Sequence, residues 1–172
     1  IVDLIDKYDN IPIHYAIFFK NVQAIQYLIN ANSNMNLTDK QGNNSLHLAI
    51  YTKNLEICAI IVNTNANINA KTKIGETPLH IACNFQLVDI VKLLIENGAD
   101  PNIQDNNEDT SPLIYAISVN NIIITDYLLE NGADPNIQDV VGNSAIFYAV
   151  IESNYQVLNS LLLFKKSNLE VN

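Results

Sequence analysis

The ten residues ENGADPNIQD occur twice in the chain, at Glu96–Asp105 and again at Glu130–Asp139, 34 residues apart. Self-similarity at a period of about 20 to 50 residues is typical of repeat proteins, in which each short unit buries its apolar face only against its neighbours. Function is then expected on a surface that recurs along the array, not in a single pocket.

The same period runs through the whole chain. Spacings of 33, 33, 33 and 34 residues separate the equivalent residues Asp6, Asp39, Thr72, Asp105 and Asp139. An Ala follows ten residues later in four units and eleven residues later in the fourth, so the extra residue lies in the turn at 105–110. The period predicts one domain, with the end of an earlier finger at 1–5 and repeats at about 6–38, 39–71, 72–104, 105–138 and 139–172.

Each unit has the pattern of two helices joined by a short break. In the second unit, apolar residues recur at helical spacing within residues 45–52 and again within residues 55–63. Two such helices form a hairpin with one shared apolar face, and neighbouring hairpins stack through it. The pattern therefore predicts an all-α fold.

Residues that tolerate a left-handed backbone separate the helices. The position after the second helix holds, in chain order, Asn32, Asn65, Gly98, Gly132 and Lys165. We expect the first four to end their helices in a left-handed conformation. The tight position of the next turn holds Asp9, Gly42, Gly75 and Gly142. Only the fourth unit differs, with Glu108 and Asp109 there.

Residues 77–82 read TPLHIA, and degenerate forms occupy the same place in the other units: IPIHYA (11–16), NSLHLA (44–49), SPLIYA (111–116) and SAIFYA (144–149). TPLHxA at a period of about 33 residues is the signature of ankyrin repeats. From about Asp6 to its end, the chain resembles this family. The resemblance implies an all-α ankyrin-repeat solenoid of helix-turn-helix units with β-turn fingers.

The resemblance also assigns structural roles to the motif residues, here His14, His47, Thr77, Pro78 and His80. The Thr hydroxyl would cap the first helix, and each His would bridge backbone groups of adjacent units. Where Ile11 or Asn44 replaces the Thr, we expect a weaker or different cap. Where Ile114 or Phe147 replaces the His, we expect apolar packing instead of the bridge.

The histidines and cysteines do not indicate a metal or redox site. His14, His47 and His80 are 33 residues apart, which separates neighbours by about 10 Å in packed helices, against about 2 Å for a metal bond. Cys58 and Cys83 lie on apolar helical stripes and are interpreted as buried free thiols, unless they oppose each other across repeats and form a disulfide. No phosphate-binding glycine motif appears, and no Ser has a His placed to activate it. We expect no catalysis, metal or cofactor.

Aromatic residues mark the surface on which ankyrin repeats usually bind partners, the concave face formed by the finger tips and the ends of the first helices. Alignment places Phe18, Phe19, Tyr51 and Phe85 at exposed helix positions there, with Tyr8 on the first finger. We expect these five side chains to form an apolar stripe that binds a partner. The alternative is that Phe18 or Phe19 packs under a neighbouring finger or against an earlier repeat.

Charge is divided unevenly along the chain. Residues 1–92 contain seven Lys and seven acidic residues, residues 93–164 contain ten acidic residues and no base, and the net charge is −9. Such a field repels nucleic acid and anionic membranes and favours a basic partner protein at repeats 4 and 5. Glu108 and Asp109, in the lengthened finger, are the acidic residues that we expect to contact it.

The resemblance implies a modification as well. Asparaginyl hydroxylases modify, in some ankyrin repeats, the finger position held here by Asn36, Asn69, Asn102 and Asn136, with Leu28, Leu94 and Leu128 eight residues before three of them. The structural alternative is that Asn at this position closes the turn through side-chain hydrogen bonds.

Composition narrows the class of protein. The chain has 172 residues, of which 48% are apolar and 16% charged, as expected for a folded domain. No apolar run approaches the roughly 18 residues of a membrane span, and no signal-peptide pattern opens the sequence. Arg is absent while Asn, Ile and Lys are abundant. This usage fits an AT-rich genome and permits the hypothesis of a pathogen effector that acts inside a host cell.

Residues 1–5 match the close of a finger, and the final LEVN resembles the opening of another. We therefore expect a segment of a longer chain, with a complete five-repeat protein as the alternative. The prediction is a monomeric, non-catalytic protein-recognition module of an intracellular, reducing compartment. Two other functions stay open: a targeting or regulatory segment of a larger multidomain enzyme or effector, and a structural or self-associating array.

Overall fold

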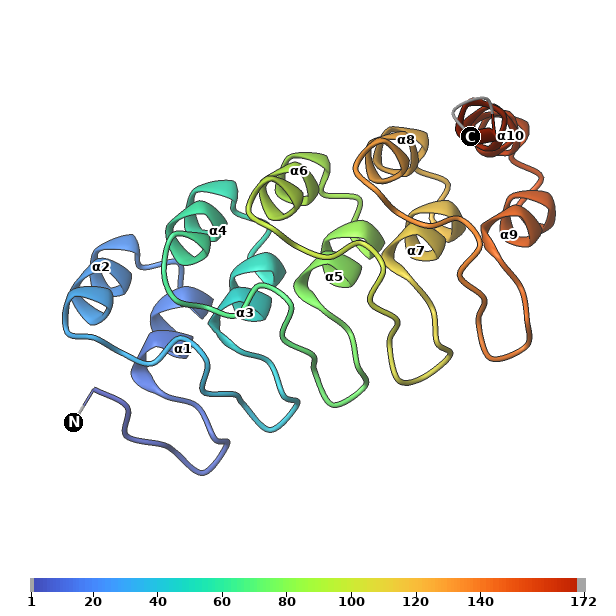
Figure 1. The fold of residues 1–172 in the computed structure, drawn as a ribbon. Helices are drawn as coiled ribbons and strands as arrows, with labels where there is room; N and C mark the ends of the chain where they lie inside the picture. The colour runs from blue at the N-terminus through green and yellow to red at the C-terminus, as the bar shows by residue number, and fades with distance from the viewer. Residues whose placement is uncertain (1, 170–172) are drawn as a thin grey trace.

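The computed structural model describes residues 2–169, with side chains from residue 2 to residue 164. Within this range ten helices form five consecutive pairs (Figure 1). Their bounds are α1 (Pro12–Phe18), α2 (Val22–Asn30), α3 (Ser45–Tyr51), α4 (Leu55–Val62), α5 (Pro78–Asn84), α6 (Val88–Glu96), α7 (Pro112–Ser118), α8 (Ile122–Glu130), α9 (Ala145–Ile151) and α10 (Tyr155–Leu169). The described residues contain no strand, which confirms the predicted all-α fold.

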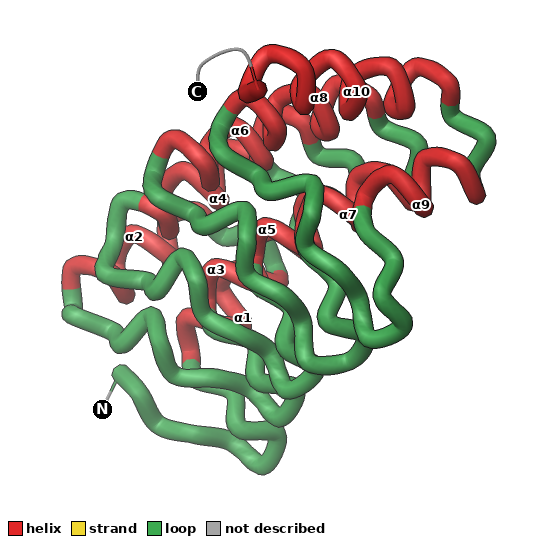
Figure 2. Tube along the Cα trace, turned by 45° about the vertical axis from the view of Figure 1, so that its right-hand side comes forward, coloured by secondary structure: helices red, strands yellow, loops and turns green. Residues whose placement is uncertain are grey.

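The helices form two layers. The first helix of each pair lies in an inner layer and the second in an outer layer (Figure 1). The loop that precedes each inner helix extends beyond the inner layer as a finger, and the fingers lie side by side in a row (Figure 2). Inner helices pack against one another more closely than outer helices do. We call the surface formed by the fingers and the adjoining side of the inner helices the inner face.

One apolar position shows how each repeat covers the one before it. Ile13, Leu46, Leu79 and Leu113 are equivalent residues of four inner helices, and each is at most 1% exposed. Burying such a side chain contributes about 1.5–3 kcal/mol. Ile146, the fifth member of the series, is 39% exposed. It lines a pocket of about 470 Å³ together with Leu161, Leu162 and Phe164 at the C-terminal end of the array.

The inner helices begin at residues suited to that position. Pro12, Pro78 and Pro112 occupy the first turns of α1, α5 and α7, where a missing N–H costs no hydrogen bond. The Asn44 side chain caps α3 by accepting two backbone N–H hydrogen bonds, each 3.1 Å long. Ile11 gives α1 no side-chain cap. The caps therefore differ between repeats: Asn44 caps α3 with its carboxamide, whereas Ile11 provides no side-chain cap.

The His80 ring connects its own helix to the next finger. Its Nδ1 accepts a hydrogen bond of 3.0 Å from the backbone N–H of Thr77 and lies 2.8 Å from the Thr77 hydroxyl. Because Nδ1 is the acceptor, Nε2 carries the proton and donates to the carbonyl of Thr110 across 3.0 Å. The predicted bridge between adjacent units is present here.

The other two histidines lie at the same point of their helices. His47 is fully buried, and its Nε2 lies 3.2 Å from the carbonyl oxygen of Glu76 in the following finger. His14 instead contacts the carbonyl of Leu37, in the extended segment before the second finger, at 3.2 Å. Burial lowers the pKa of His47 and of His80 to about 4, so both imidazoles are neutral at physiological pH.

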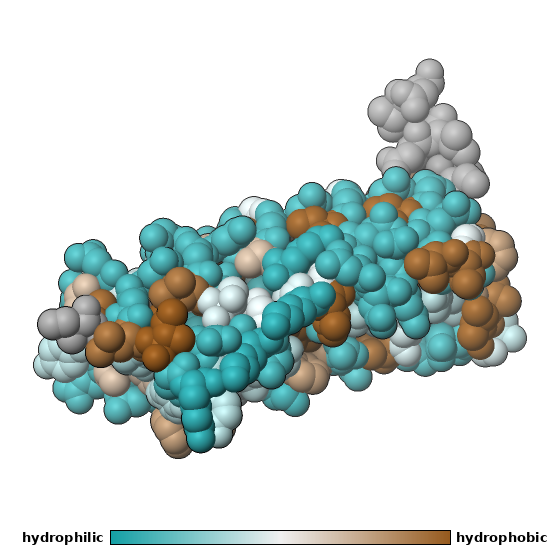
Figure 3. Space-filling model, turned by 90° about the horizontal axis from the view of Figure 1, so that it is seen from below, coloured by the Kyte–Doolittle hydropathy of each residue, from teal (hydrophilic) through white to brown (hydrophobic). Residues whose placement is uncertain are grey.

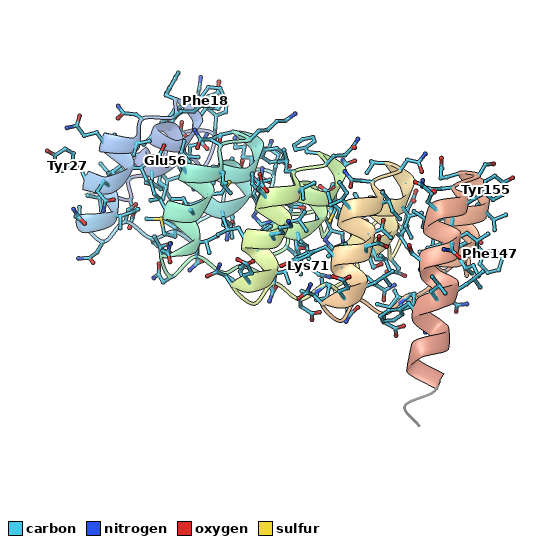
Figure 4. The ribbon with its side chains drawn as sticks, turned by 90° about the horizontal axis from the view of Figure 1, so that it is seen from above. Phe18, Tyr27, Glu56, Lys71, Phe147 and Tyr155 are labelled. Carbon is cyan, nitrogen blue, oxygen red and sulfur yellow. The ribbon has the colours of Figure 1, made fainter. Side chains whose placement is uncertain are left out.

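Apolar packing replaces the His bridge at one position and not at the other. Ile114 is 1% exposed, as predicted. Phe147 is 53% exposed and points outward at the C-terminal end of the array (Figure 4). The prediction was wrong for Phe147 because, in the part of the chain that the structure describes, no further finger lies beyond it to cover the ring.

Side-chain amides join the turns of neighbouring repeats. The Asn102 carboxamide accepts a hydrogen bond from the backbone N–H of Asp134 at 2.7 Å and donates to the carbonyl of Gly132 at 2.9 Å. Asn36 and Asn69 bridge to the following repeat in the same way. These hydrogen bonds tie one repeat to the next instead of closing the residue's own turn, and they account for Asn at this position without any modification.

We call Asn36, Asn69, Asn102 and Asn136 the amide series. The residues at its two ends make different contacts from those in its middle. The Asp3 carboxylate accepts a hydrogen bond of 3.1 Å from the backbone N–H of Asn34, which is the bond that Asn36 makes one repeat later. Asn136 donates only within its own turn, to the side chain of Asp134 at 2.9 Å. Asn136 is thus the one member of the series, within the described residues, that ties no further repeat to the array.

Three of the four predicted left-handed helix ends are present, with φ of 58°, 89° and 89° at Asn32, Gly98 and Gly132. The prediction was wrong for Asn65, which has no positive φ. There the Thr64 hydroxyl donates to the carbonyl of Ile61 at 2.6 Å, so a side chain satisfies the helix end. Lys165 does not end its helix either, since α10 continues to Leu169.

All five fingers keep the left-handed residue of the tight turn. φ is 86°, 85° and 87° at Gly42, Gly75 and Gly142, and 63° at Asp9. In the lengthened fourth finger Asp109 takes this conformation, with φ of 53°. Asp is one of the residue types that adopt it at modest cost. Asp109 therefore has a backbone role that the sequence pattern did not reveal.

A single backbone hydrogen bond joins each pair of neighbouring fingers from the second finger onward. The N–H donors and carbonyl acceptors are Lys73 to Gln41 at 2.9 Å, Asn106 to Ile74 at 3.0 Å, and Val140 to Glu108 at 2.9 Å. The fingers consequently hold a fixed register although they form no sheet.

Candidate protein-binding surface

The C-terminal ends of the inner helices carry exposed aromatic rings in the first repeat. Phe18 and Phe19 are each 71% exposed, and their ring centroids lie 5.2 Å apart in an edge-to-face arrangement. Phe18 projects from the edge of the array (Figure 4). Neither ring is covered by a finger, so of the two packing alternatives the one under a neighbouring finger does not describe the first repeat.

The second and third repeats continue the aromatic series. Tyr51 is 43% exposed, and its ring centroid lies 5.9 Å from that of Phe85. Phe85 is only half-buried and packs against the apolar core, while the Lys53 ammonium lies 4.6 Å from its ring centroid. The structure thus places Phe85 partly in the core and leaves only part of its ring available to a partner.

Tyr8 lies on the first finger, between two ammonium groups. Its side chain is 52% exposed, and the Nζ atoms of Lys7 and Lys40 lie 4.8 and 5.8 Å from its ring centroid. Such cation–π contacts contribute about 0.5–1 kcal/mol at exposed sites. Seen from the finger side, apolar side chains gather mainly toward the two ends of the array, and polar side chains cover most of the middle (Figure 3).

An acidic pocket of about 270 Å³ lies on the inner face beside α7, lined by residues that include Asp105, Glu108, Tyr115 and Tyr148. Glu108 is exposed, and its carboxylate makes no hydrogen bond, while its backbone carbonyl holds the fifth finger. The Asp109 side chain is also exposed. Of the two predicted contact residues, the structure therefore brings Glu108 to a pocket and uses Asp109 to shape the turn.

Hydrogen bonds set the charge of Asp105 in this pocket. Burial opposes its ionisation, but hydrogen bonds from the backbone N–H of Glu108 and the hydroxyl of Tyr115 outweigh burial and hold its pKa below the ordinary value. Glu76 shares the same hydroxyl at 3.2 Å. Burial, together with the nearby Asp105 charge, raises the pKa of Glu76.

Three tyrosines of the inner helices repeat one contact that the sequence interpretation missed. The hydroxyls of Tyr15, Tyr115 and Tyr148 donate to the first acidic residue of their own fingers, Asp6, Asp105 and Asp139. Burial, reinforced by the bond to Asp139, raises the pKa of Tyr148 to about 12. The recurrence of Tyr nine or ten residues after the finger Asp was the available signal. In the other two repeats this position holds Leu48 and Ile81.

Both cysteines are buried free thiols. Burial raises the pKa of Cys58 to about 12 and raises that of Cys83 as well, so neither is a ready nucleophile. Over residues 2–164 no three His, Cys, Asp or Glu side chains come together as metal ligands could. No helix of the described chain has the length and hydropathy needed to cross a membrane.

Comparison with known families agrees with this geometry. The family model described as ankyrin repeats (3 copies) matches residues 13–105 and, in a second overlapping match, residues 79–172. The chain belongs to the ankyrin-repeat family. A search of curated proteins finds no match. Ankyrin repeats are generally protein–protein interaction modules, and their domains are typically non-catalytic.

Proposed function

We propose that the chain is a non-catalytic recognition module that binds a partner protein through the inner face, with the fingers and the ends of the inner helices as contact points. The observation that carries the proposal is the exposed aromatic series of the first two repeats. Phe18 and Phe19 are each 71% exposed, so packing within the described fold does not account for these large apolar rings. Exposed apolar groups of this size usually mark contact sites.

The acidic pocket beside α7 supports a second contact. Residues 93–164 carry ten acidic residues and no base, and the free carboxylate of Glu108 faces this pocket together with the charged Asp105. A basic part of the partner would be attracted there over a range of about 8–10 Å at physiological ionic strength.

The proposal includes a monomer in a reducing intracellular compartment. Its support is the pair Cys58 and Cys83, which are both free and buried. Free buried cysteines are compatible with a compartment that keeps thiols reduced.

The test is selection from a displayed library of random peptides on the immobilised protein, compared with a variant that carries Phe18→Ser, Phe19→Ser and Tyr51→Ser. We expect peptides that bind the wild-type protein and lose binding to the variant, while the variant still unfolds cooperatively on heating. Phe85 is kept in the variant because its ring packs against the core. Peptides that bind both proteins equally would place the contact elsewhere, and a failure to enrich any peptide would count against the recognition function.

A further inference from the structure

Two neighbouring pockets on the inner face form a groove across the first three repeats. The first has a volume of about 430 Å³ and is lined by Phe18, Lys20, Leu48, Tyr51 and Thr52. The second has a volume of about 520 Å³, and Tyr51 lines it as well. Because Tyr51 lies between the two pockets, a single extended segment that crosses this ring would occupy both. We call this the aromatic groove.

The second pocket of the aromatic groove lies between the second and third fingers. Lys40 and Lys73 line it from those fingers, together with Ile74, which is 54% exposed, and Glu76. Each pocket thus combines apolar surface with at least one ammonium group. A ligand that fits the groove must satisfy both kinds of surface.

Three of the seven lysines among the first 92 residues line the aromatic groove. These three are Lys20, Lys40 and Lys73. Lys7 and Lys53 lie against the rings of Tyr8 and Phe85, which do not line the two pockets. The other two face other surfaces. Lys71 donates to the carbonyl of Gln104 at 2.7 Å, and Lys92 lies 5.8 Å from the ring centroid of Tyr127 on α8.

Of the acidic residues near the groove, Asp39 and Asp6 are occupied by their own fingers, and Glu76 accepts from the hydroxyl of Tyr115 at 3.2 Å. The Asp39 carboxylate accepts hydrogen bonds from the backbone N–H groups of Gln41 and Asn43 and from the Asn43 side chain, each 2.9 Å long. Asp6 accepts from two backbone N–H groups and from the hydroxyl of Tyr15. Over residues 2–164 no carboxylate lies within ion-pair distance of Lys20, Lys40 or Lys73, so their charge is available to a ligand.

We propose that the aromatic groove binds an acidic polypeptide segment, in which a bulky apolar side chain sits beside Tyr51 and flanking Asp or Glu side chains pair with Lys20, Lys40 and Lys73. This inference rests on the proposed recognition function and names the chemistry of the partner at this site. Edge-to-face pairs such as Phe18–Phe19 offer ring surface for an apolar anchor. The ammonium groups add orientation and association rate.

The charge of the rest of the array fixes the direction of the bound segment. The acidic pocket beside α7, with Asp105 and Glu108, would repel the same carboxylates. The acidic segment of the partner therefore lies over the first three repeats, and any basic segment lies over the fourth and fifth. One partner that spans the inner face would carry opposite charges at its two ends.

The test uses two synthetic peptides with the same central Phe and Leu, one flanked by Asp and Glu and the other by Lys and Arg. Binding to the whole chain is followed by fluorescence anisotropy at low and high salt. We expect the acidic peptide to bind at least about tenfold more tightly than the basic one, with an affinity that falls as salt rises. Equal affinities, or preference for the basic peptide, would overturn the inference.

Two single variants with the same change in net charge locate the site. Lys20→Glu removes an ammonium group of the aromatic groove, and Lys92→Glu removes one on the outer layer. We expect Lys20→Glu to lower the affinity for the acidic peptide by about fivefold or more. Lys92→Glu should leave that affinity within about twofold of the wild-type value. Equal losses would show a general charge effect and reject the site.

The outcomes separate this inference from the proposed function. If the displayed library yields peptides that require Phe18, Phe19 and Tyr51 but carry no excess of Asp or Glu, the recognition function stands and the acidic ligand is rejected. If neither the library nor the acidic peptide gives binding, both proposals fail together.

Discussion

The hydroxyl of Tyr115 donates to the carboxylate of Asp105 across 3.0 Å, and so ties the inner helix α7 to the start of the fourth finger. Tyr115→Phe removes this bond and leaves the ring in place. We expect a loss of about 1.5–3 kcal/mol in the free energy of unfolding at neutral pH, the usual contribution of a hydrogen bond to a charged group. Urea denaturation of the two proteins measures it.

The pH dependence of that loss checks its cause. The lowered pKa of Asp105 contributes stability above its ordinary value of 3.8, and this contribution is lost as pH falls through the folded-state pKa. The difference between wild type and Tyr115→Phe should therefore shrink as pH falls below the ordinary pKa of 3.8 and through the lower folded-state pKa. A difference that stays constant with pH would assign the loss to packing of the ring.

The pKa of Glu76 is shifted in the opposite direction to that of Asp105, so its contribution to stability should depend on pH with the opposite sign. Its raised pKa means that the folded state favours the protonated carboxyl, so this residue contributes stability below its ordinary pKa of 4.5 and loses it as pH rises through the folded-state pKa. Glu76→Gln keeps an acceptor for Tyr115 without the charge. We expect the variant to be more stable by up to about 1 kcal/mol at pH 7. A stability below that of the wild type would show that the Glu76 charge is favourable.

The buried imidazoles predict a marked loss of stability in mild acid. The pKa values of His47 and His80 fall from 6.5 to about 4 on folding, so unfolding takes up protons between these values. The stabilisation that each neutral ring contributes is present above pH 6.5 and decreases by about 3 kcal/mol toward pH 4. Denaturation profiles at several pH values measure this slope. His47→Gln with His80→Gln should flatten it, and an unchanged slope would assign the effect to other groups.

The amide series offers a matched pair of variants. Asn102 bridges two groups of the next repeat, whereas Asn136 bonds only within its own turn. Asn102→Ala leaves a backbone N–H and a carbonyl without their partner and should cost about 1–3 kcal/mol. Asn136→Ala should cost clearly less, because among the described residues its carboxamide makes one hydrogen bond within its own turn and none to another repeat. Thermal unfolding of both variants measures the difference, and equal losses would mean that the bridge between repeats adds nothing.

Two glycines of the finger turns separate backbone strain from crowding. Gly75 and Gly142 both have a positive φ, but a Cβ on Gly75 would lie 2.1 Å from the backbone nitrogen of Asn106, while one on Gly142 would meet nothing within 4 Å. Gly142→Ala should therefore cost only about 1–2 kcal/mol for the left-handed conformation. Gly75→Ala should cost more, because the third and fourth fingers must move apart. Chemical denaturation of the two variants tests this order, which equal costs would contradict.

Most of the fold followed from the sequence, because the demands on each turn are local. The left-handed glycines and the Asn bridges recur at fixed positions, and the packing of each repeat depends only on its neighbours. Asn65 shows the limit of this inference. Its residue type allows the left-handed conformation, but Thr64 supplies a hydroxyl that ends α4 without it.

The candidate surface was harder to predict, since exposure depends on which side chains the neighbouring repeats cover. Phe19 and Phe85 occupy the same place in their repeats, yet the first is 71% exposed and the second packs against the core. The link from Tyr115 to Asp105 was missed because the two residues lie in different elements, and only the assembled finger brings the hydroxyl to the carboxylate.

The single backbone hydrogen bond between neighbouring fingers has a mechanical consequence. The helices share a continuous apolar core, which resists deformation, whereas the finger row is held from the second finger onward by one backbone hydrogen bond for each step, such as Asn106 to Ile74, and by a few exposed side-chain bonds. The array should therefore bend elastically, with the helix layers as its stiff side and the row of fingers as its more easily deformed side. A wide or narrow ligand would change its curvature at low elastic cost, and pulling on its two ends would lengthen it before any repeat unfolds.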